Sequence, residues 1–242
     1  MPLSVEAVPC LSDNYCWLLR DGASGAVAVC DPGEAAPVEA ALDRAGGRLD
    51  LILLTHHHGD HVGGVEALRA RYGAKVAGAA ADAHRLPPLD IAVRPGEGVA
   101  LGASRAEVID TPGHTRGHIA YHFPEGKVLL CGDTLFSLGC GRLLEGTAEE
   151  MFRSLRALAA LPDETLVCCG HEYTEGNARF ALTVEPDNAA LQARAREVAA
   201  QRAAGRPTVP TTLGQEKAQN PFLRAPDAAR LAEIRAAKDG FR

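Results

Sequence analysis

The residues best suited to chemistry form one short run, THHHGDH, at residues 55–61. Within it, His56, His58, Asp60 and His61 follow the pattern H-x-H-x-D-H. Imidazole and carboxylate groups are donors that zinc and iron prefer. Four such groups in one turn are costly to bury without a partner. We therefore expect this run to bind metal rather than to form a polar loop of solvated histidines.

Three further candidate ligands lie downstream, each beside a glycine and just after a predicted strand: His114, Asp133 and His171. Each of them alone would more often be structural than a ligand. Loops on a rigid scaffold are nevertheless where functional sites are usually built. Together with the run they give seven candidate ligands, too many for one tetrahedral zinc and enough for two metal ions with an open position.

Apolar runs separated by Gly, Pro and Asp residues predict the strands and helices that must position these residues. Strands are predicted at residues 3–8, 15–20, 26–31, 49–54, 106–110, 119–123, 127–131 and 165–169. Helices are predicted at 34–45, 62–72 and 148–161, the last with Thr147 as its N-cap. After residue 170 the chain becomes rich in Ala, Arg and Glu, with helices predicted at 188–204 and 227–238 around a Pro-containing segment, 206–221. We expect an α/β catalytic domain over 1–172 and a smaller helical domain over 173–242.

Charge, hydropathy and cysteine content exclude several classes of protein and indicate where the chain functions. The 242 residues carry a net charge of −6, which argues against non-specific nucleic-acid binding, and no apolar run approaches a membrane span. The chain start does not resemble a secretory signal, and the seven cysteines are odd in number without C-x-x-C, so we expect reduced thiols and a cytoplasmic location. Residues 194–242 hold ten Lys/Arg and five Asp/Glu, either a solvated helical surface or a cationic wall for an anionic small molecule.

These motifs resemble those of the metallo-β-lactamase superfamily, and more narrowly those of the glyoxalase II (hydroxyacylglutathione hydrolase) family. The superfamily resemblance rests on the H-x-H-x-D-H run with its three downstream ligands. The narrower resemblance rests on DTLF at 133–136, GCGR at 139–142, CGHEYT at 169–174 and NPFLR at 220–224. It spans nearly the whole chain and implies an αββα sandwich followed by a small C-terminal helical domain.

The resemblance also implies the ligand set. His56, His58 and His114 would hold one metal ion, while Asp60, His61 and His171 would hold the second. Asp133 would bridge the two ions, and Asp60 would help to orient the nucleophile, so these two are the expected catalytic carboxylates. Asp31 matches an acidic position that the superfamily keeps beside the metal ligands. The expected cofactors are two divalent ions, zinc first, with iron or manganese as alternatives.

The reaction that the resemblance implies is hydrolysis of S-D-lactoylglutathione, and of other S-2-hydroxyacylglutathiones, to glutathione and D-lactate. A hydroxide shared by the two ions would be the nucleophile in this second step of methylglyoxal detoxification. Arg142 stands where many relatives have Lys, and Leu144 where many have Tyr. We expect a monomer whose partner is a small-molecule glutathione thioester, with no nucleic acid and no membrane. The expected substrate contacts are Arg142, Leu143, Leu144, His171, Tyr173, Arg235 and Lys238.

Two other functions share parts of this pattern. A glutathione-persulfide dioxygenase would use much of the ligand set with one iron, but such relatives typically lack the helical tail with NPF at 220–222. A binding module with a purely structural metal would have a closed four-ligand site, which seven ligands exceed. Hydrolysis of a glutathione thioester remains the favoured function.

Overall fold

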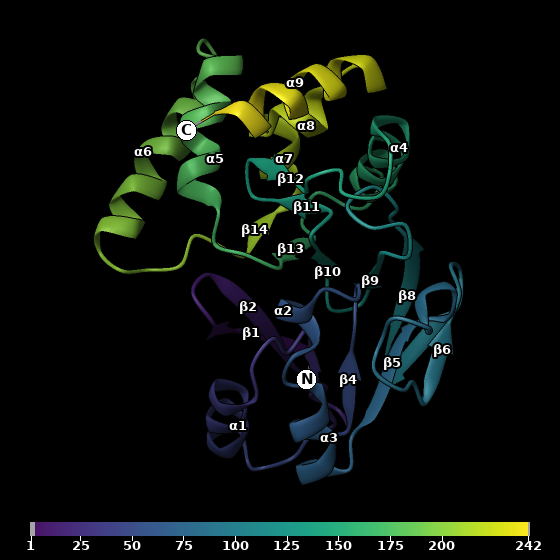
Figure 1. Cartoon of the computed structure of the whole chain (residues 1–242). Coiled ribbons are helices and arrows are strands. Elements are labelled where there is room, and N and C mark those ends of the chain that lie inside the picture. The colour runs from purple at the N-terminus through teal and green to yellow at the C-terminus, as the bar shows by residue number, and fades with distance from the viewer. Residues whose placement is uncertain (1–2, 242) are drawn as a thin grey trace. The chain divides into compact units, whose positions relative to one another are not determined.

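A computed structural model describes residues 3–241 (Figure 1). The outermost residues of the two predicted domains, 1, 2 and 242, lie outside the described residues. The chain divides into two compact units. The N-terminal unit comprises residues 1–110 and 117–132, and the C-terminal unit comprises residues 111–116 and 133–242. Because residues 111–116 belong to the second unit, His114 is grouped with Asp133 and His171 rather than with the histidine run.

The N-terminal unit begins with a mixed sheet. Strands β1 (Ser4–Cys10), β2 (Asn14–Arg20) and β3 (Val27–Cys30) pair antiparallel. Strands β4 (Leu51–Leu53), β5 (Lys75–Ala79) and β6 (Ile91–Val93) continue the sheet from β3 in parallel. Strand β4 is a fully buried Leu-Ile-Leu run, as expected of a parallel strand covered on both faces. The parallel order brings the ends of β3 and β4 to the same edge of the sheet.

A second group of strands in this unit is an antiparallel meander of β7 (Gly98–Leu101), β8 (Ser104–Asp110), β9 (Ile119–Phe123) and β10 (Val128–Gly132). Tyr121 connects this meander to the first sheet, because its hydroxyl donates to the carbonyl oxygens of Leu54 (3.1 Å) and Ala77 (3.4 Å). The Tyr121 side chain is fully buried, and burial raises its pKa well above the usual value. The two groups of strands therefore share one core.

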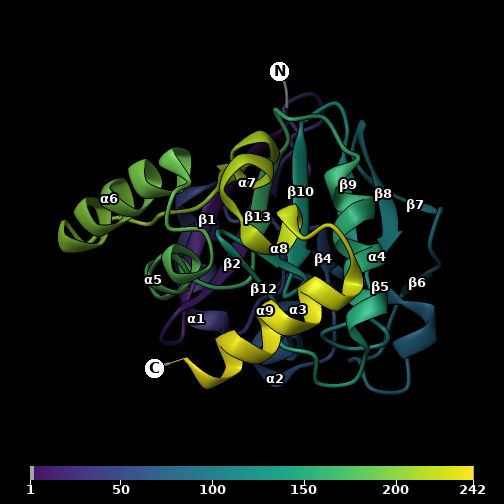
Figure 2. The ribbon, with the colours of Figure 1, turned by 90° about the horizontal axis from the view of Figure 1, so that it is seen from above.

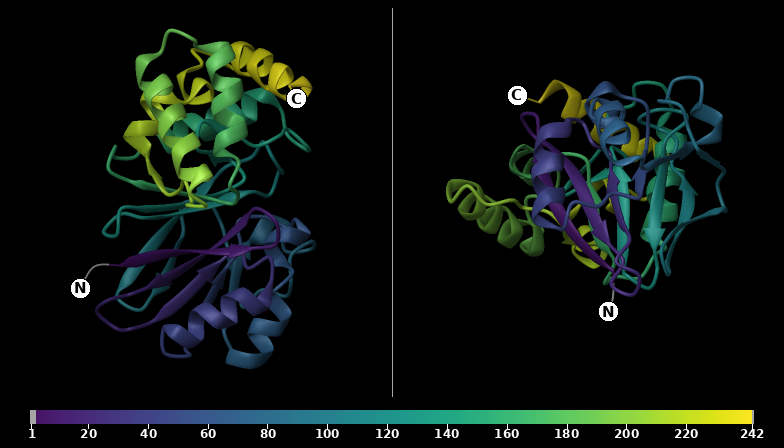
Figure 3. Two further views of the ribbon diagram at one scale, coloured as in Figure 1. Left: turned by 90° about the vertical axis from the view of Figure 1, so that its left-hand side faces the viewer. Right: turned by 90° about the horizontal axis from the view of Figure 1, so that it is seen from below.

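Helices α1 (Ala35–Arg44) and α3 (Val65–Tyr72) cover one face of the first sheet. Val38, Leu42 and Leu68 belong to the same buried cluster as Val29 and Ile52 of the strands. The left panel of Figure 3 shows these two blue helices together on one side of the purple strands. Burying an aliphatic side chain of this size contributes about 1.5–3 kcal/mol, so this layer fixes the sheet edge that carries the candidate ligands.

The C-terminal unit combines short strands with helices. Strands β11 (Leu135–Phe136) and β12 (Gly139–Cys140) form a hairpin, and β13 (Leu166–Cys169) pairs with β14 (Thr211–Thr212). Figure 2 shows the helices of this unit, with α9 in yellow beside α4 in green-teal, two helices that also contact each other. Its helices are α4 (Ala148–Ala159), α5 (Thr174–Val184), α6 (Ala189–Ala203), α7 (Leu213–Gln219), α8 (Pro221–Arg224) and α9 (Ala228–Gly240).

The structure corrects two expected elements. The helix predicted over 62–72 breaks at Gly63 and Gly64, so that a separate turn, α2 (Gly59–Val62), precedes α3. A Cβ on Gly64 would lie 2.8 Å from the Pro32 carbonyl oxygen, so the close approach of two chain segments separates these helices. The segment 206–221, expected only as a Pro-containing link between helices, contains β14 and α7. No helix among residues 3–241 is long and apolar enough to cross a membrane.

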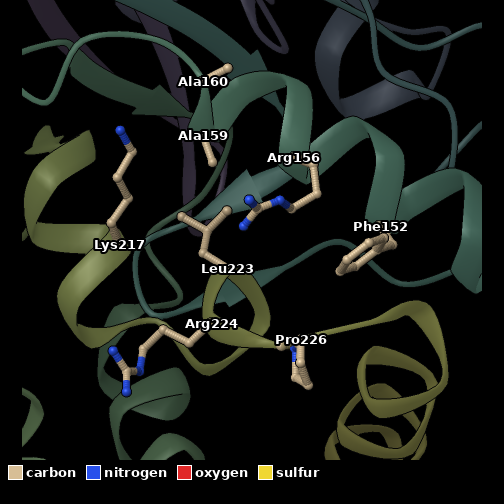
Figure 4. A pocket seen from close by; sticks show the side chains of 9 residues that line it. Phe152, Arg156, Ala159, Ala160, Lys217, Leu223, Arg224 and Pro226 are labelled. Carbon is tan, nitrogen blue, oxygen red and sulfur yellow. The ribbon is translucent and has the colours of Figure 1, made fainter.

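The C-terminal unit also contains a cavity of about 800 Å³ between α4, α7 and α8 (Figure 4). Its lining has three cations, Arg156, Lys217 and Arg224. Lys217 pairs with Asp163 (2.6 Å) and Arg224 pairs with Glu185 (2.9 Å). None of the predicted site residues lines this cavity, so it is distinct from the predicted site.

Candidate active site

The histidine run lies where β4 leaves the sheet. The strand ends at Leu53, residues 54–58 form the loop, and α2 starts at Gly59 with His58 at its N-cap. This sharp turn places His56 and His58 so that Nε2 of the first lies 3.0 Å from Nδ1 of the second. Two imidazole nitrogens that face each other at this distance can bind the same cation. His56 is fully buried, so its ring cannot move far from this position.

Asp31 is the central polar residue beneath the run. It follows β3, which is the parallel neighbour of β4, and its backbone adopts a left-handed conformation (φ 53°). Its Oδ1 accepts from the Thr55 backbone N–H (2.8 Å) and its Oδ2 accepts from the Thr55 hydroxyl (2.6 Å). The same Oδ2 lies 3.2 Å from Nδ1 of His61. A carboxylate on one ring nitrogen leaves the other nitrogen available as a ligand.

Asp60 is held from the side by Asn14 at the start of β2. The Asn14 amide donates to the Asp60 carboxylate (2.9 Å) and to its backbone carbonyl oxygen (3.2 Å). Nε2 of His61 lies 3.5 Å from Oδ2 of Asp60. These contacts keep one imidazole nitrogen and one carboxylate oxygen together, as two ligands of one ion require. Asn14 is not among the residues predicted from the sequence, because nothing local marks it.

His57 and His118, two histidines outside the expected ligand set, fix the shape of the loop that carries the run. Nδ1 of His57 lies 2.9 Å from the buried Asp82 carboxylate, which also accepts from Arg85 Nε at 2.6 Å. His118 is fully buried and stacks on His56, with ring centroids 4.8 Å apart and planes 24° from parallel. Both histidines therefore support the run from outside the expected ligand set. Sequence reasoning missed Asp82, which is 25 residues from its partner.

The C-terminal unit brings its three candidate ligands to a single point. Nε2 of His114 lies 3.5 Å from Oδ2 of Asp133, and Nε2 of His171 lies 3.4 Å from the same oxygen. All three side chains are more than nine-tenths buried. Nδ1 of His114 lies 2.9 Å from the Arg142 carbonyl oxygen, which directs Nε2 toward Asp133. Two imidazole nitrogens and one carboxylate oxygen that converge in this way can serve as ligands of a divalent cation.

Aromatic side chains support His171. Tyr173, two residues later, stacks on the His171 ring with centroids 4.6 Å apart and planes 3° from parallel. Phe136 of β11 meets both rings edge-on, at 5.9 Å from His171 and 5.3 Å from Tyr173. Tyr173 is 41% exposed, while its ring face packs on the candidate metal ligand His171.

The loop after β12 carries Arg142, Leu143 and Leu144. Arg142 is exposed, and its Nε lies 3.9 Å from an oxygen of Asp239. Leu144 is 59% exposed, the highest fraction among the large apolar side chains of residues 3–241. An exposed leucine here provides apolar contact but no hydroxyl. The same loop holds His114 through the Arg142 carbonyl oxygen, so a candidate metal ligand and candidate substrate contacts share one segment.

Arg235 and Lys238 lie one turn apart on α9. Arg235 is buried, donates to the Cys140 carbonyl oxygen (2.8 Å) and pairs with Asp239 (2.9 Å). Lys238 donates to the Gly176 carbonyl oxygen (3.1 Å). Burial lowers the pKa of Lys238, and the positive charges of Arg235, Arg179 and Arg142 lower it further. These cations are therefore close enough to act on one another, as an anion-binding site requires.

The donor groups in each unit fit a divalent metal ion. In the N-terminal unit, ligand atoms of Asp31, His56 and His61 lie within 4.8 Å of one another. In the C-terminal unit, two imidazole nitrogens approach one carboxylate oxygen. Nitrogen and oxygen donors without a thiolate suit zinc, iron or manganese. All seven cysteines are buried and free of disulfides, and none of them belongs to a candidate metal cluster among residues 3–241.

Comparison with known proteins identifies the family. Residues 11–171 match the model of the metallo-β-lactamase superfamily, and residues 172–241 match that of the hydroxyacylglutathione hydrolase C-terminus. A hydroxyacylglutathione hydrolase of Ruegeria pomeroyi is 56% identical over 255 aligned residues, which cover 100% of each chain.

Two solved structures are similar over most of their length. ETHE1 from Myxococcus xanthus is 28% identical with a TM-score of 0.74, covering 98% of this chain and 90% of that one. TTHA1623 in a di-iron-bound form is also 28% identical, with a TM-score of 0.64, covering 90% of this chain and 99% of that one. The metallo-β-lactamase fold with a C-terminal helical region is thereby confirmed. Within this fold, the His and Asp clusters indicate a divalent-metal site. The chain belongs to the hydroxyacylglutathione hydrolase (glyoxalase II) family of the metallo-β-lactamase superfamily.

Proposed function

We propose that this chain is a thioester hydrolase that converts S-D-lactoylglutathione and related S-2-hydroxyacylglutathiones to glutathione and the free hydroxy acid. The observation that carries the proposal is the convergence of His114 and His171 on one oxygen of Asp133, together with the H-x-H-x-D-H run. Full-length identity of 56% to a hydroxyacylglutathione hydrolase supports the choice of substrate. The same reaction is the second step of methylglyoxal detoxification.

We further propose that the seven candidate ligands serve one dinuclear centre. This assignment follows the family pattern residue by residue and the donor chemistry found in each unit. His56, His58 and His114 would hold one ion, Asp60, His61 and His171 the other, and Asp133 both. Zinc is the first candidate, with iron and manganese as alternatives. A pair of such ions supplies a water molecule of lowered pKa and a Lewis acid for the thioester carbonyl.

The residues around the ligands have separable tasks. Asp31 orients His61 through Nδ1 and ties it to Thr55. Asn14 orients the Asp60 carboxylate. The Arg142 carbonyl oxygen orients His114, and Tyr173 stacks on His171. Each contact restricts a ligand that would otherwise rotate, and supporting contacts of this kind typically contribute tenfold to hundredfold in metal affinity or activity.

The leaving group suits this set of residues. A thiol has a pKa near 8.5, so it leaves as a thiolate without a strong general acid, whereas an amine must be protonated. Neither the sequence nor the described residues 3–241 single out a further side chain beside the candidate ligands as such an acid. Thioester hydrolysis is therefore compatible with these residues.

Cationic and apolar groups of the C-terminal unit would bind the glutathione part of the substrate. Arg142, Arg235 and Lys238 carry positive charge toward its carboxylates, and Tyr173 offers a hydroxyl. Leu143 and Leu144 would supply apolar contact next to Arg142. Arg142 keeps the charge of the lysine found in many relatives but presents a planar guanidinium. Leu144 lacks the hydroxyl of the usual tyrosine, so we expect weaker binding at that point.

The test compares two thioesters on one sample of known metal content. Thiol release from S-D-lactoylglutathione should exceed release from a lactoyl thioester of N-acetylcysteamine, which lacks the glutathione carboxylates. Equal kcat/KM values for the two esters would overturn the glutathione assignment. One bound iron per chain with oxygen uptake on glutathione persulfide would instead identify a persulfide dioxygenase.

We propose a catalytic domain over residues 1–172 and a substrate-binding helical domain over 173–242. We also propose a cytoplasmic monomer, in keeping with seven buried cysteines that form no disulfide. Sedimentation velocity on the purified chain would test the monomer.

A further inference from the structure

A cluster of positive charge lies on α9 and the elements that pack near it in the C-terminal unit. Arg142, Arg179, Arg235 and Lys238 contribute four cations, and Asp239 is the carboxylate that acts among them. The charges of the three arginines all act on Lys238, which places the four groups within electrostatic range. Arg179, on α5, is the member that the family resemblance did not predict.

The cations of this cluster differ in how many hydrogen bonds and ion pairs they make. Arg235 is fixed by the Cys140 carbonyl oxygen and by Asp239, although its buried Nε has no hydrogen-bond partner among residues 3–241. Lys238 is fixed by the Gly176 carbonyl oxygen and lies over the rings of Phe180 (5.3 Å) and Phe241 (5.5 Å). The single carboxylate of Asp239 cannot neutralise four cations, so the cluster keeps an excess of positive charge.

Arg179 is exposed and makes no hydrogen bond or ion pair with any residue in the described part of the chain. Its guanidinium lies close to the backbone of Gly176, one turn earlier on α5, because a Cβ built on that glycine would be 3.9 Å from Nη2 of Arg179. The Gly176 carbonyl oxygen is also the acceptor for Lys238. The Arg179 guanidinium, on α5, and the Lys238 ammonium, on α9, therefore both lie near Gly176.

Like charges brought together without enough counter-charge are unfavourable, so such a cluster indicates an anionic ligand. A guanidinium with all its N–H donors available can hold a carboxylate through two parallel hydrogen bonds. Glutathione carries two carboxylates at a distance from its sulfur. Arg179, lying near Lys238, is therefore suited to bind one of the glutathione carboxylates rather than the reacting acyl group.

We propose that Arg179 is a further substrate-binding residue, which pairs with Lys238 to recognise a carboxylate of the thiol carrier. The proposal rests on the proposed glutathione-thioester hydrolysis and extends its binding site to α5. Arg179 selects for the carboxylate-bearing carrier and does not contact the scissile bond. Its removal should therefore weaken binding of the substrate and leave the chemical step unchanged.

The test uses the metal-loaded enzyme and three variants. Arg179→Ala removes the guanidinium, and Arg179→Lys keeps the charge without the planar fork. Arg196→Ala, at an exposed position of α6, is the control with the same change in net charge. We expect KM for S-D-lactoylglutathione to rise on the order of tenfold in Arg179→Ala with kcat within about twofold, because a hydrogen bond to a charged group is worth about that factor. Arg179→Lys should fall between, and Arg196→Ala should match the wild type.

Binding of S-methylglutathione, measured by calorimetry, provides a readout without turnover. Its Kd should rise in Arg179→Ala by the same factor as KM. The S-lactoyl ester of N-acetylcysteamine, which has no carboxylate, should be hydrolysed equally by wild type and Arg179→Ala. An unchanged Kd and KM in Arg179→Ala would overturn the role of Arg179. A wild type that prefers neither ester would overturn the glutathione assignment instead, and the calorimetric comparison would still decide whether Arg179 binds the carboxylates.

Discussion

Asp31 Oδ2 lies 3.2 Å from Nδ1 of His61, although 30 residues separate the two in the chain. The contact exists because β3 and β4 run parallel and side by side, so that the residues after each strand meet at one sheet edge. Both side chains are buried, at 3% and 1% exposure. A buried carboxylate on a buried imidazole holds the ring in one orientation, with Nε2 3.5 Å from the Asp60 carboxylate.

The first prediction concerns this pair. Asparagine tolerates the left-handed backbone of residue 31 and preserves its size. In Asp31→Asn, metal affinity should fall by roughly tenfold to hundredfold, because the carboxylate that orients His61 and increases its basicity is lost. Competition with a zinc chelator would measure the change. An Asp31→Asn protein that retains wild-type affinity would show that His61 needs no such support.

Replacing Asp133 tests whether its carboxylate is shared by two metal ions. If both ions share its carboxylate, Asp133→Ala should lose nearly all thioesterase activity, at least about a hundredfold in kcat, because metal ions supply several kcal/mol of charge stabilisation. Metal analysis should show fewer than two ions per chain, while circular dichroism confirms the fold. Asp163→Ala, at an exposed position, serves as a control and should stay active. An Asp133→Ala variant with full metal content and full activity would contradict the bridging role.

Lys238 should contribute charge rather than shape. Lys238→Met keeps an unbranched chain against Phe180 and Phe241 but removes the ammonium group. We expect KM for S-D-lactoylglutathione to rise about tenfold, with kcat changed less than about twofold. Steady-state kinetics at two ionic strengths would check this, since added salt should raise KM more in the wild type than in the variant. A drop in kcat at constant KM would argue for a role in chemistry instead.

Leu144 offers a gain-of-binding test. The side chain is 59% exposed, so a tyrosine fits without disturbing a core. Leu144→Tyr should lower KM by roughly fivefold, the equivalent of one hydrogen bond worth about 1 kcal/mol. Leu144→Phe separates the hydroxyl from the ring and should change KM less. If Phe and Tyr variants behave alike, the hydroxyl has no part in binding.

We expect the buried Glu216 carboxylate to contribute to the free energy of unfolding. This carboxylate is fully buried and accepts from the Leu138 backbone N–H (2.8 Å), the Thr211 hydroxyl (2.8 Å) and the Asn220 amide (3.1 Å). Burial raises its pKa above the ordinary value of 4.5. Glu216→Ala should lower the free energy of unfolding by about 3 kcal/mol or more, because several buried donors lose their acceptor.

The pH dependence of Glu216 has a definite sign. The folded protein binds a proton at Glu216 more readily than the unfolded chain, so the contribution of this group to stability falls as pH rises above about 4.5, until the raised folded pKa is passed. Glu216→Gln cannot titrate. The free energy of unfolding of the wild type minus that of Glu216→Gln should therefore decrease over this window, measured by urea denaturation. A difference that increases with pH would contradict a raised pKa.

Much of the scaffold could be predicted because its elements carry local signals. The apolar runs of β4, β9, β10 and β13 stand between turn residues, and Thr147 caps α4 as expected by accepting from the Glu150 backbone N–H. Strands of two residues, such as β11, β12 and β14, are too short to show such a pattern. Hydrogen bonding defines them, within a hairpin for β11 and β12 and with the much earlier β13 for β14. The turn at Gly63 and Gly64 depends on a close approach to Pro32 and Gly33, which periodicity alone does not show.

The residues of the candidate site likewise fall into those that local sequence motifs indicate and those that only the folded chain shows. The spacing of the histidine run and the family motifs are local features of the sequence, and they are sufficient to indicate every candidate ligand. Asn14, Asp82 and Arg179 could not be found in this way. Asn14 and Asp82 act on residues 46 and 25 positions away, and Arg179 stands out only because two helices bring it near Lys238. Supporting residues of this kind become visible only when the chain is folded.

The central claim is that two metal ions and the seven ligands hydrolyse a glutathione thioester. The most direct measurement titrates metal-free protein with zinc while following thiol release from S-D-lactoylglutathione. The account predicts that activity rises until two zinc ions are bound per chain and then stays constant. Full activity at one ion per chain, or no thiol release with zinc, iron or manganese, would contradict it.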